Sequence, residues 1–191
     1  MEILISEKID KKTQALNFFE KMILSKTKEL AIEVKKVTEE DGFIKLIVEG
    51  EDLTIFLNII KNDFGLAPRH INELKVNPVF KAFISNIQED KLYLDAGIIQ
   101  PSPFKVYISI ETLWSQLTYG KKEGLKNILT QYCLFKDLPV EVIVASINKD
   151  EVEVAFSDKQ LHFFGELQTL PFERIIIADA LINEVRKAVK L

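Results

Sequence analysis

The sequence predicts an α+β protein built of three small modules. Residues 1–66 show strand and helix patterns in the order β-α-β-β-α. Residues 76–120 contain three short strand patterns followed by a helix, and residues 121–191 again combine a hairpin with helices. These patterns predict an N-terminal β-α-β-β-α module, a central small β-sheet, and a C-terminal module of a β-hairpin plus helices.

The first module begins with an alternating strand pattern at Glu2–Ile9. Asp10 is placed to cap the helix that follows, because an aspartate carboxylate accepts hydrogen bonds from the free N–H groups of a first turn. The apolar residues of this helix recur every three or four positions. They are Ala15, Phe18, Phe19, Met22 and Ile23.

Two strands and a second helix complete this module. Leu30–Val37 and Phe43–Glu49 alternate apolar and polar residues, and the polar run 39–42 between them predicts a hairpin turn. The second helix has one apolar stripe, and Gly65 is placed to end it. The stripe consists of Leu53, Phe56, Leu57, Ile60 and Phe64. Prolines 68 and 78 predict a linker over Leu66–Asn77, so we expect residues 1–65 to form a separable unit.

The central module is predicted from strands at Val79–Ile87, Lys91–Ile99 and Phe104–Ile110 and a helix that begins near Glu111. Three short strands followed by a helix fit part of an oligonucleotide-binding (OB) barrel. The run FKAFISNIQEDKLYLDAGI also resembles the opening hairpin of S1-type RNA-binding domains. The resemblance implies an S1-like or OB-like module.

The last module is predicted from a hairpin of Pro139–Ile147 and Glu151–Phe156. Helices are expected at Glu123–Tyr132 before this hairpin and at Ser157–Leu167 after it, where Ser157 or Asp158 would cap and Gln160 would complete a capping box. A short strand, Arg174–Ile177, then leads into a final amphipathic helix. Its inward residues are Leu181, Val185, Ala188 and Val189.

Three triplets in the central module read lysine, any residue, aromatic. They are Lys81-Ala82-Phe83, Lys91-Leu92-Tyr93 and Lys105-Val106-Tyr107. In a strand, residues two apart project from the same face, so each triplet presents an ammonium group beside a ring. If the three strands are neighbours, this lysine-aromatic face would offer cations for phosphates and rings for bases of single-stranded RNA or DNA.

The same triplets have an ordinary structural explanation. Lysine and tyrosine are common on exposed strands, and lysine protects sheet edges from aggregation. Phe80, Ala82 and Ile84 already give the first strand one apolar face. The alternative is therefore that Phe83, on the other face, packs under a neighbouring module or a protein partner.

Composition and charge narrow the class of protein. The 191 residues are 47% hydrophobic and 28% charged, which excludes a disordered chain. The net charge is −4, with 10 lysines against 13 acidic residues in residues 1–64, and this disfavours tight, nonspecific binding to duplex nucleic acid. No apolar run reaches the roughly 18–20 residues of a membrane-spanning helix, and Met1–Ile9 lacks the apolar stretch of a signal peptide.

The single cysteine, Cys133, excludes an internal disulfide and fits a reducing cytoplasm. Its neighbours Tyr132 and Leu134 predict a buried thiol. The two histidines, His70 and His162, have no further ligands at metal spacing. With no nucleophile, base or metal cluster in view, we expect a non-enzymatic protein without a cofactor or a bound metal.

The whole pattern resembles an uncharacterised archaeal family, domain of unknown function 2110. The stretches that carry the resemblance are LNIIKNDFG, KAFISNIQEDKLYLDAG, PVEVIVASINKDEVEVAFSDKQL and RIIIADALINEVRKAVK. The resemblance implies an archaeal cytoplasmic protein and brings no established activity.

Together these observations favour an RNA-binding accessory factor of archaeal translation or RNA metabolism. In it Phe83, Tyr93 and Tyr107 would stack bases, while Lys81, Lys91 and Lys105 would contact phosphates. The rival hypothesis is a protein-protein adaptor whose acidic first module docks on the ribosome or RNA polymerase.

Overall fold

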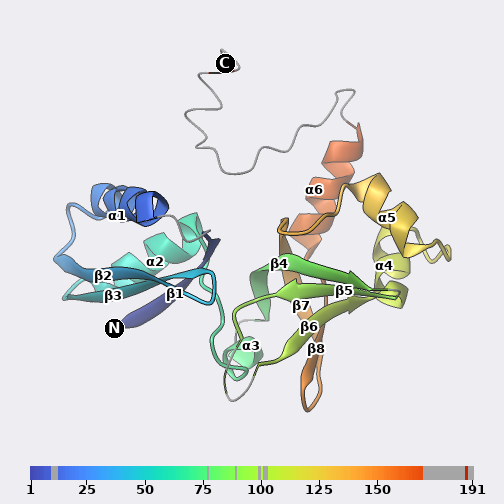
Figure 1. Ribbon diagram of the computed structural model, residues 1–191, viewed down its shortest axis with the longest axis horizontal. Coiled ribbons are helices and arrows are strands. Elements are labelled where there is room, and N and C mark those ends of the chain that lie inside the picture. Colours follow the sequence, from blue (N-terminus) through green and yellow to red (C-terminus); the bar gives the residue numbers. More distant parts are fainter. Residues whose placement is uncertain are drawn as a thin grey trace.

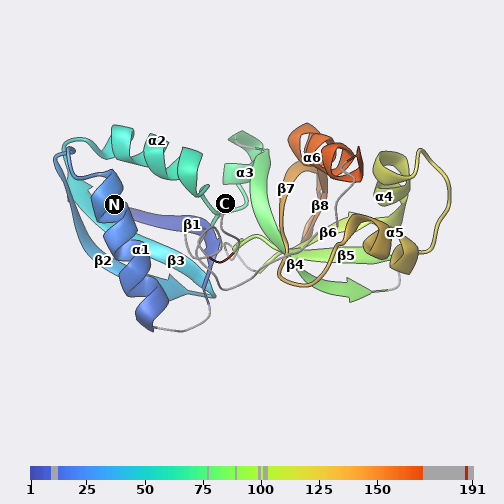
Figure 2. The same ribbon diagram turned by 90° about the horizontal axis from the view of Figure 1, so that it is seen from above.

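The computed structural model of the chain describes residues 1–9, 13–76, 78–88, 90–98, 100, 103–169 and 188. Within these residues the chain forms two lobes that lie side by side, as both ribbon views show (Figures 1 and 2). The first lobe comes from residues 1–66 and the second from residues 78–169. No helix in the described part of the chain is long and apolar enough to cross a membrane.

The first lobe is a three-stranded antiparallel sheet with two helices on one face (Figure 1). Its elements are β1 (Glu2–Lys8), α1 (Thr13–Lys26), β2 (Ile32–Glu40), β3 (Phe43–Gly50) and α2 (Leu53–Asp63). The strand order β1-β3-β2 places the last strand between the first two, so β1-α1-β2 is a split β-α-β unit. The predicted β-α-β-β-α module is therefore confirmed.

Local sequence explains how two of these elements end. Asp41 and Gly42 have φ angles of 53° and 85°, as a tight two-residue hairpin turn requires. Gly65, with φ of 81°, ends α2, and its N–H donates to the carbonyls of Ile60 and Lys61. The predicted cap of α1, Asp10, lies outside the described residues.

The second lobe is a closed, OB-like barrel of five strands. The strands are β4 (Val79–Gln88), β5 (Lys91–Asp95), β6 (Lys105–Ser109), β7 (Pro139–Ile147) and β8 (Glu151–Phe156). Around the barrel they follow the order β4-β5-β6-β8-β7, and the β6–β8 pair is parallel while the other pairs are antiparallel.

In the described part of the chain, four helices accompany the barrel. They are α3 (Glu73–Val76) before β4, α4 (Ile110–Leu117) and α5 (Leu125–Tyr132) between β6 and β7, and α6 (Asp158–Thr169) after β8. The chain passes through α4, α5 and β7 on its way from β6 to β8. The parallel β6–β8 pair needs such a long connection, because parallel strands cannot be joined by a tight turn. In α4, the Ser109 hydroxyl accepts a hydrogen bond from the N–H of Thr112 at 3.3 Å and so caps the first turn.

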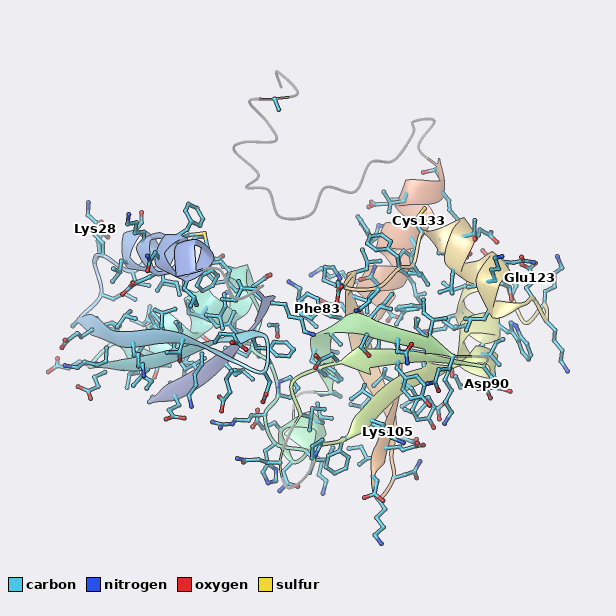
Figure 3. All side chains as sticks on the ribbon, in the orientation of Figure 1. Lys28, Phe83, Asp90, Lys105, Glu123 and Cys133 are labelled. Atoms are coloured by element: carbon cyan, nitrogen blue, oxygen red, sulfur yellow. The ribbon has the colours of Figure 1, made fainter. Side chains whose placement is uncertain are left out.

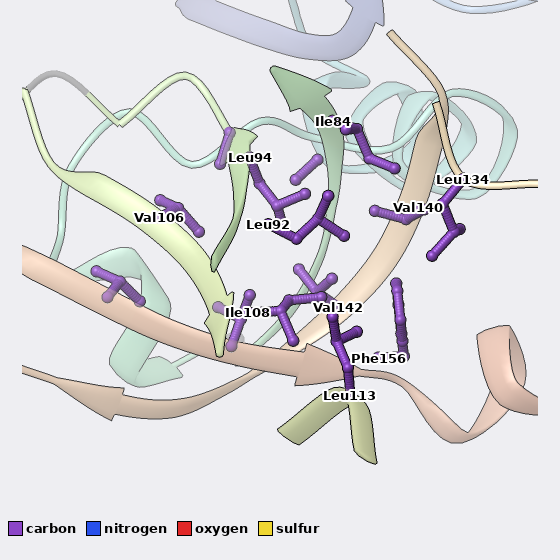
Figure 4. Close-up of a cluster of buried hydrophobic side chains, with 14 of the residues drawn as sticks. Ile84, Leu92, Leu94, Val106, Ile108, Leu113, Leu134, Val140, Val142 and Phe156 are labelled. Atoms are coloured by element: carbon purple, nitrogen blue, oxygen red, sulfur yellow. The ribbon is translucent and has the colours of Figure 1, made fainter. Parts of the chain in front are cut away.

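Alternate residues of every barrel strand point inward and build one apolar core (Figure 4). Ile84, Leu92, Ile108 and Val142, from four strands, are each fully buried. Leu113 of α4 joins them from outside the sheet. The alternation that predicted the strands therefore also decides which side chains fill the barrel.

The barrel combines strands from two stretches that the sequence assigned to separate modules, 76–120 and 121–191. β7 pairs with β4, and β8 pairs with β6, so the hairpin of residues 139–156 closes the sheet begun by residues 79–109. Neither pairing has a local signal in the sequence, because strands this far apart in the chain meet only in the folded protein.

The predicted linker, Leu66–Asn77, is packed against both lobes over its described residues, 66–76. The N–H of Ser6 donates to the Gly65 carbonyl at 3.1 Å, and the N–H of Ala67 donates to the Leu4 carbonyl at 3.0 Å, so the chain continues alongside β1 as it leaves α2. Leu74 of α3 is buried in the barrel core.

Three further predictions concern Cys133, the cap of α6, and the C-terminal strand and helix. Cys133 is exposed, so the prediction of a buried thiol was wrong: the residue ends α5 with φ of 52°. Ser157 caps α6 through the N–H of Gln160, but the Gln160 side chain accepts from the N–H of Glu141 and forms no capping box. The strand Arg174–Ile177 lies outside the described residues. Of the final helix only Ala188 is described: it is helical but exposed, so the prediction that it packs inward was wrong.

Candidate nucleic-acid interface

The three strands that carry the lysine-aromatic triplets are neighbours in the barrel, as the hypothesis required. β5 lies between β4 and β6, and Tyr93 stands directly opposite Tyr107. The residues between lysine and ring point into the barrel core, so the lysines and rings project from its outer surface. The inward residues are Ala82, Leu92 and Val106.

The first triplet is covered by the first lobe. Phe83 is only 6% exposed and meets Phe43 of β3 edge to face, with ring centroids 6.0 Å apart. The Lys81 ammonium donates to Glu7 of β1 at 2.6 Å. Figure 3 shows Phe83 at the junction of the two lobes. The structure thus gives Phe83 the packing role that was the alternative to base stacking.

Lys8 of β1 contacts residues of both lobes at the same junction. Its ammonium lies 5.2 Å from the Phe43 ring centroid and 5.5 Å from that of Phe83, and it forms an ion pair with Asp95. Attraction between an ammonium group and the faces of aromatic rings stabilises such an arrangement. The surface available to a ligand therefore begins beyond Asp95, on β5 and β6.

The second and third triplets form a compact group there. The rings of Tyr93 and Tyr107 are 6.3 Å apart between centroids, and Tyr93 is partly exposed. The Lys91 ammonium lies 3.9 Å from the Tyr107 centroid and 3.6 Å from a carboxylate oxygen of Glu151. Tyr107 is consequently only 8% exposed, whereas Lys105, at the start of β6, is exposed (Figure 3).

Burial raises the pKa of the Tyr107 phenol above its ordinary value. The Lys91 ammonium opposes this shift, and the neighbouring carboxylates of Glu153 and Glu151 add to it. The phenol therefore keeps its proton, and its ring remains neutral, throughout the physiological pH range.

Two acidic residues of β8 belong to this surface as well. Because β8 lies beside β6, Glu151 stands opposite Lys105 and Glu153 stands opposite Tyr107. One oxygen of Glu153 accepts hydrogen bonds from the hydroxyls of Ser109 at 2.6 Å and Thr112 at 3.3 Å. The alternating pattern showed that both glutamates are outward, but it carried no signal that they join the tyrosines.

With the barrel and its outer surface described, comparison with known families assigns this part of the chain. Residues 74–168 match the sequence model of the DUF2110 central domain. This segment is a DUF2110 central domain. The resemblance noted in the sequence is therefore confirmed over these residues, while no curated protein matches the chain in a sequence comparison.

The DUF2110 central domain coincides with the barrel and its helices. The match begins in α3 and ends in the last turn of α6. The first lobe lies outside the match, so the junction formed by Phe43 and Phe83 joins the DUF2110 central domain to a separate β-α-β-β-α lobe.

The outer surface of β5, β6 and β8 carries mixed charge. Lys91 and Lys105 both lie beside Glu151, Glu153 stands opposite Tyr107, and Asp95 at the rim is paired with Lys8. A surface of this kind suits a short ligand with both charged and flat parts, because a long polyanion would also meet the carboxylates. The DUF2110 central domain therefore presents a small aromatic patch flanked by two lysines.

The remaining sequence candidates have structural partners. The His70 ring accepts a hydrogen bond from the N–H of Asn72 at 3.0 Å, and His162 lies 3.2 Å from Glu166 one helical turn away. The Ser157 hydroxyl donates to Glu141 at 2.6 Å. Among the described residues, no group of three or more histidine, cysteine or acidic side chains is gathered to hold a metal ion.

Proposed function

We propose that the DUF2110 central domain binds single-stranded RNA on the outer surface of β5 and β6. The protein would act without catalysis, as a cytoplasmic accessory factor of archaeal translation or RNA metabolism. The observation that carries the proposal is the adjacent pair Tyr93 and Tyr107, flanked by Lys91 and Lys105, on the second and third strands of an OB-like barrel. OB-folds bind oligonucleotides on this pair of strands.

The proposed site uses four of the six residues of the lysine-aromatic face. They are Lys91, Tyr93, Lys105 and Tyr107. Lys81 and Phe83 instead hold the two lobes together. The footprint is therefore one or two bases wide.

Binding would begin at Tyr93 and Lys105, which are already accessible. Tyr107 becomes available when Lys91 leaves its ring and pairs with a phosphate. A base stacked on a ring contributes more than an ammonium group on the same ring at an exposed site, so this exchange is favourable. Lys91 would serve both states, as a cover for Tyr107 in the free protein and as a partner of the phosphate in the complex.

The test measures binding of a fluorescent short single-stranded RNA of mixed base composition by anisotropy at low ionic strength. Changing Tyr93 and Tyr107 together to leucine keeps apolar bulk but removes the flat surface. Because stacking contributes about 1–3 kcal/mol per base, affinity should fall at least about tenfold. Tyr119→Leu is the matched control, since this tyrosine is fully exposed in the turn after α4 and should bind like wild type.

The two lysines are tested through the salt dependence of the same measurement. Changing Lys91 and Lys105 to glutamine should flatten the log-log dependence of affinity on salt by about 0.7 for each phosphate that is no longer neutralised. Lys28→Gln in the first lobe is the control and should leave this slope unchanged. Failure of the wild-type protein to bind the oligonucleotide at low salt would overturn the proposal.

A second candidate function is a protein-protein adaptor that docks on the ribosome or RNA polymerase. It is favoured by a cleft of about 600 Å³ between the end of α2 and the β4–β7 side of the barrel. Val79 in this cleft is 46% exposed, and its cross-strand neighbour Ile143 is 37% exposed. Changing both to serine should abolish co-sedimentation with ribosomes or polymerase if the adaptor function holds, and should leave oligonucleotide binding intact.

A further inference from the structure

Glu153 is held in place beside the two tyrosines, and the RNA-binding site proposed above gives it no role. It lies opposite Tyr107 on the outer surface. Burial is the main cause of the raised pKa of the Tyr107 phenol, and the nearby Glu153 carboxylate raises it further. Within the described residues, the hydrogen-bond partners of the carboxylate are two hydroxyls, from Ser109 and Thr112. Both donate to the same oxygen, Oε1.

This arrangement leaves the second oxygen, Oε2, as an acceptor beside the stacking surface. The carboxylate of the nearby Glu151 differs from that of Glu153 in having a cation beside it, because the Lys91 ammonium lies 3.6 Å away. A phosphate would be repelled by Glu153, whereas an N–H group on the edge of a stacked base would be attracted. The two hydroxyls hold the side chain in place, so little conformational freedom is lost when a base binds.

We infer, resting on the proposed function, that Glu153 selects the base stacked on Tyr93 and Tyr107 by accepting hydrogen bonds from its edge. Guanine fits best, because its Watson–Crick edge presents two adjacent N–H donors to one acceptor. Uracil fits worst, because its single N–H lies between two carbonyl oxygens that a carboxylate repels. The ligand class is therefore single-stranded RNA with a guanine at the stacked position.

The experiment compares four short RNA oligonucleotides that differ only in the central base of an otherwise uridine sequence. The guanine oligonucleotide should bind roughly tenfold tighter than the uridine one, since a good donor-acceptor match to a base edge is worth about 1–3 kcal/mol. Glu153→Gln keeps an oxygen for Ser109 and Thr112 but replaces Oε2 by a donor. It should remove the guanine preference without weakening the uridine oligonucleotide.

Glu151→Gln is the matched control on the same strand. It should change the affinity for all four oligonucleotides alike, because it alters Lys91 and not the base edge. Equal affinity of the wild type for all four, or a guanine preference that survives Glu153→Gln with an unchanged melting temperature, would overturn the base selection and leave RNA binding standing. Absence of binding to every oligonucleotide would overturn both proposals.

Discussion

At the scale of single residues, identical local patterns lead to different roles. Phe83 and Tyr107 each follow a lysine by two positions in an outward strand register. Phe83 is buried against Phe43 of the other lobe, whereas Tyr107 is covered by Lys91 of its own sheet. The two roles differ because different groups cover the two rings, and the strand pattern does not predict which group covers which ring.

Phe83→Ala should therefore lower the stability of the protein and not its affinity for RNA. Removing a buried phenylalanine side chain costs about 3–5 kcal/mol, because apolar burial is reduced and a cavity remains. Urea unfolding should show this loss, while Phe18→Ala, which truncates a ring that is 44% exposed, should stay within about 0.5 kcal/mol of wild type. Equal effects of the two substitutions would contradict the buried junction.

Tyr107 should ionise at higher pH than an exposed tyrosine, because burial raises its pKa. Its neutral form is favoured by the fold, so the stability it contributes is fully present below the unfolded-state pKa and is lost as pH rises through the folded-state pKa. Absorbance titration should show a late phenol ionisation that Tyr107→Phe removes. Tyr119→Phe, which changes a fully exposed side chain, should leave the late ionisation of Tyr107 in place.

At the scale of elements, short turns decide how the lobes can approach. β5 ends at Asp95, and Gly97 follows with φ of 77°. A Cβ atom at Gly97 would lie 3.3 Å from a methyl group of Leu4 and 3.5 Å from the Phe43 ring. The missing side chain therefore lets the first lobe sit against the end of β5.

Gly97→Ala should destabilise the protein by more than the backbone conformation alone explains. A residue with a Cβ in the left-handed region costs about 1–2 kcal/mol. Gly120→Ala isolates this cost, because Gly120 has φ of 81° with nothing within 4 Å of the added atom. Thermal melting should place Gly97→Ala below Gly120→Ala, and equal melting temperatures would show that the close approach carries no strain.

At the scale of the whole molecule, the two lobes form one packed body and are not separate units on a free linker. Ala67 and Pro68 are buried, and Leu74 enters the barrel core. Two ion pairs, Lys8 with Asp95 and Lys81 with Glu7, cross the junction. Since these pairs are partly exposed, they contribute less than the buried apolar contacts between them.

Limited trypsin digestion should leave the peptide bond after Arg69 intact while the exposed loop at Lys121 and Lys122 is cut first. Arg69 is ion-paired with Glu40 at 2.7 Å and follows buried chain, and a protease needs an accessible, extended segment. Mass spectrometry of early fragments identifies the site. Cleavage after Arg69 as fast as after Lys121 would indicate that the lobes separate in solution.

The sequence by itself determined which side of each strand is apolar and the positions of the strands and helices over the described residues, except α3, which lies within the predicted linker. These features depend on spacing within a few residues, as at Val79–Gln88, where Phe80, Ala82 and Ile84 alternate into the core. The triplets likewise predicted that Lys91 and Tyr93 face outward together. Turn residues such as Gly42 and Gly65 set the ends of their elements because few other residues adopt positive φ.

Only the tertiary structure decided what lies beside each outward residue. The parallel β6–β8 pairing brings Glu151 and Glu153 to the tyrosines, and the docking of the first lobe removes Phe83 from the surface. Both depend on contacts between segments distant in the chain, where many pairings satisfy the same alternation. The β6–β8 pairing and the docking of the first lobe are favoured because of the total apolar surface that the whole fold buries, and no short stretch of sequence encodes that total.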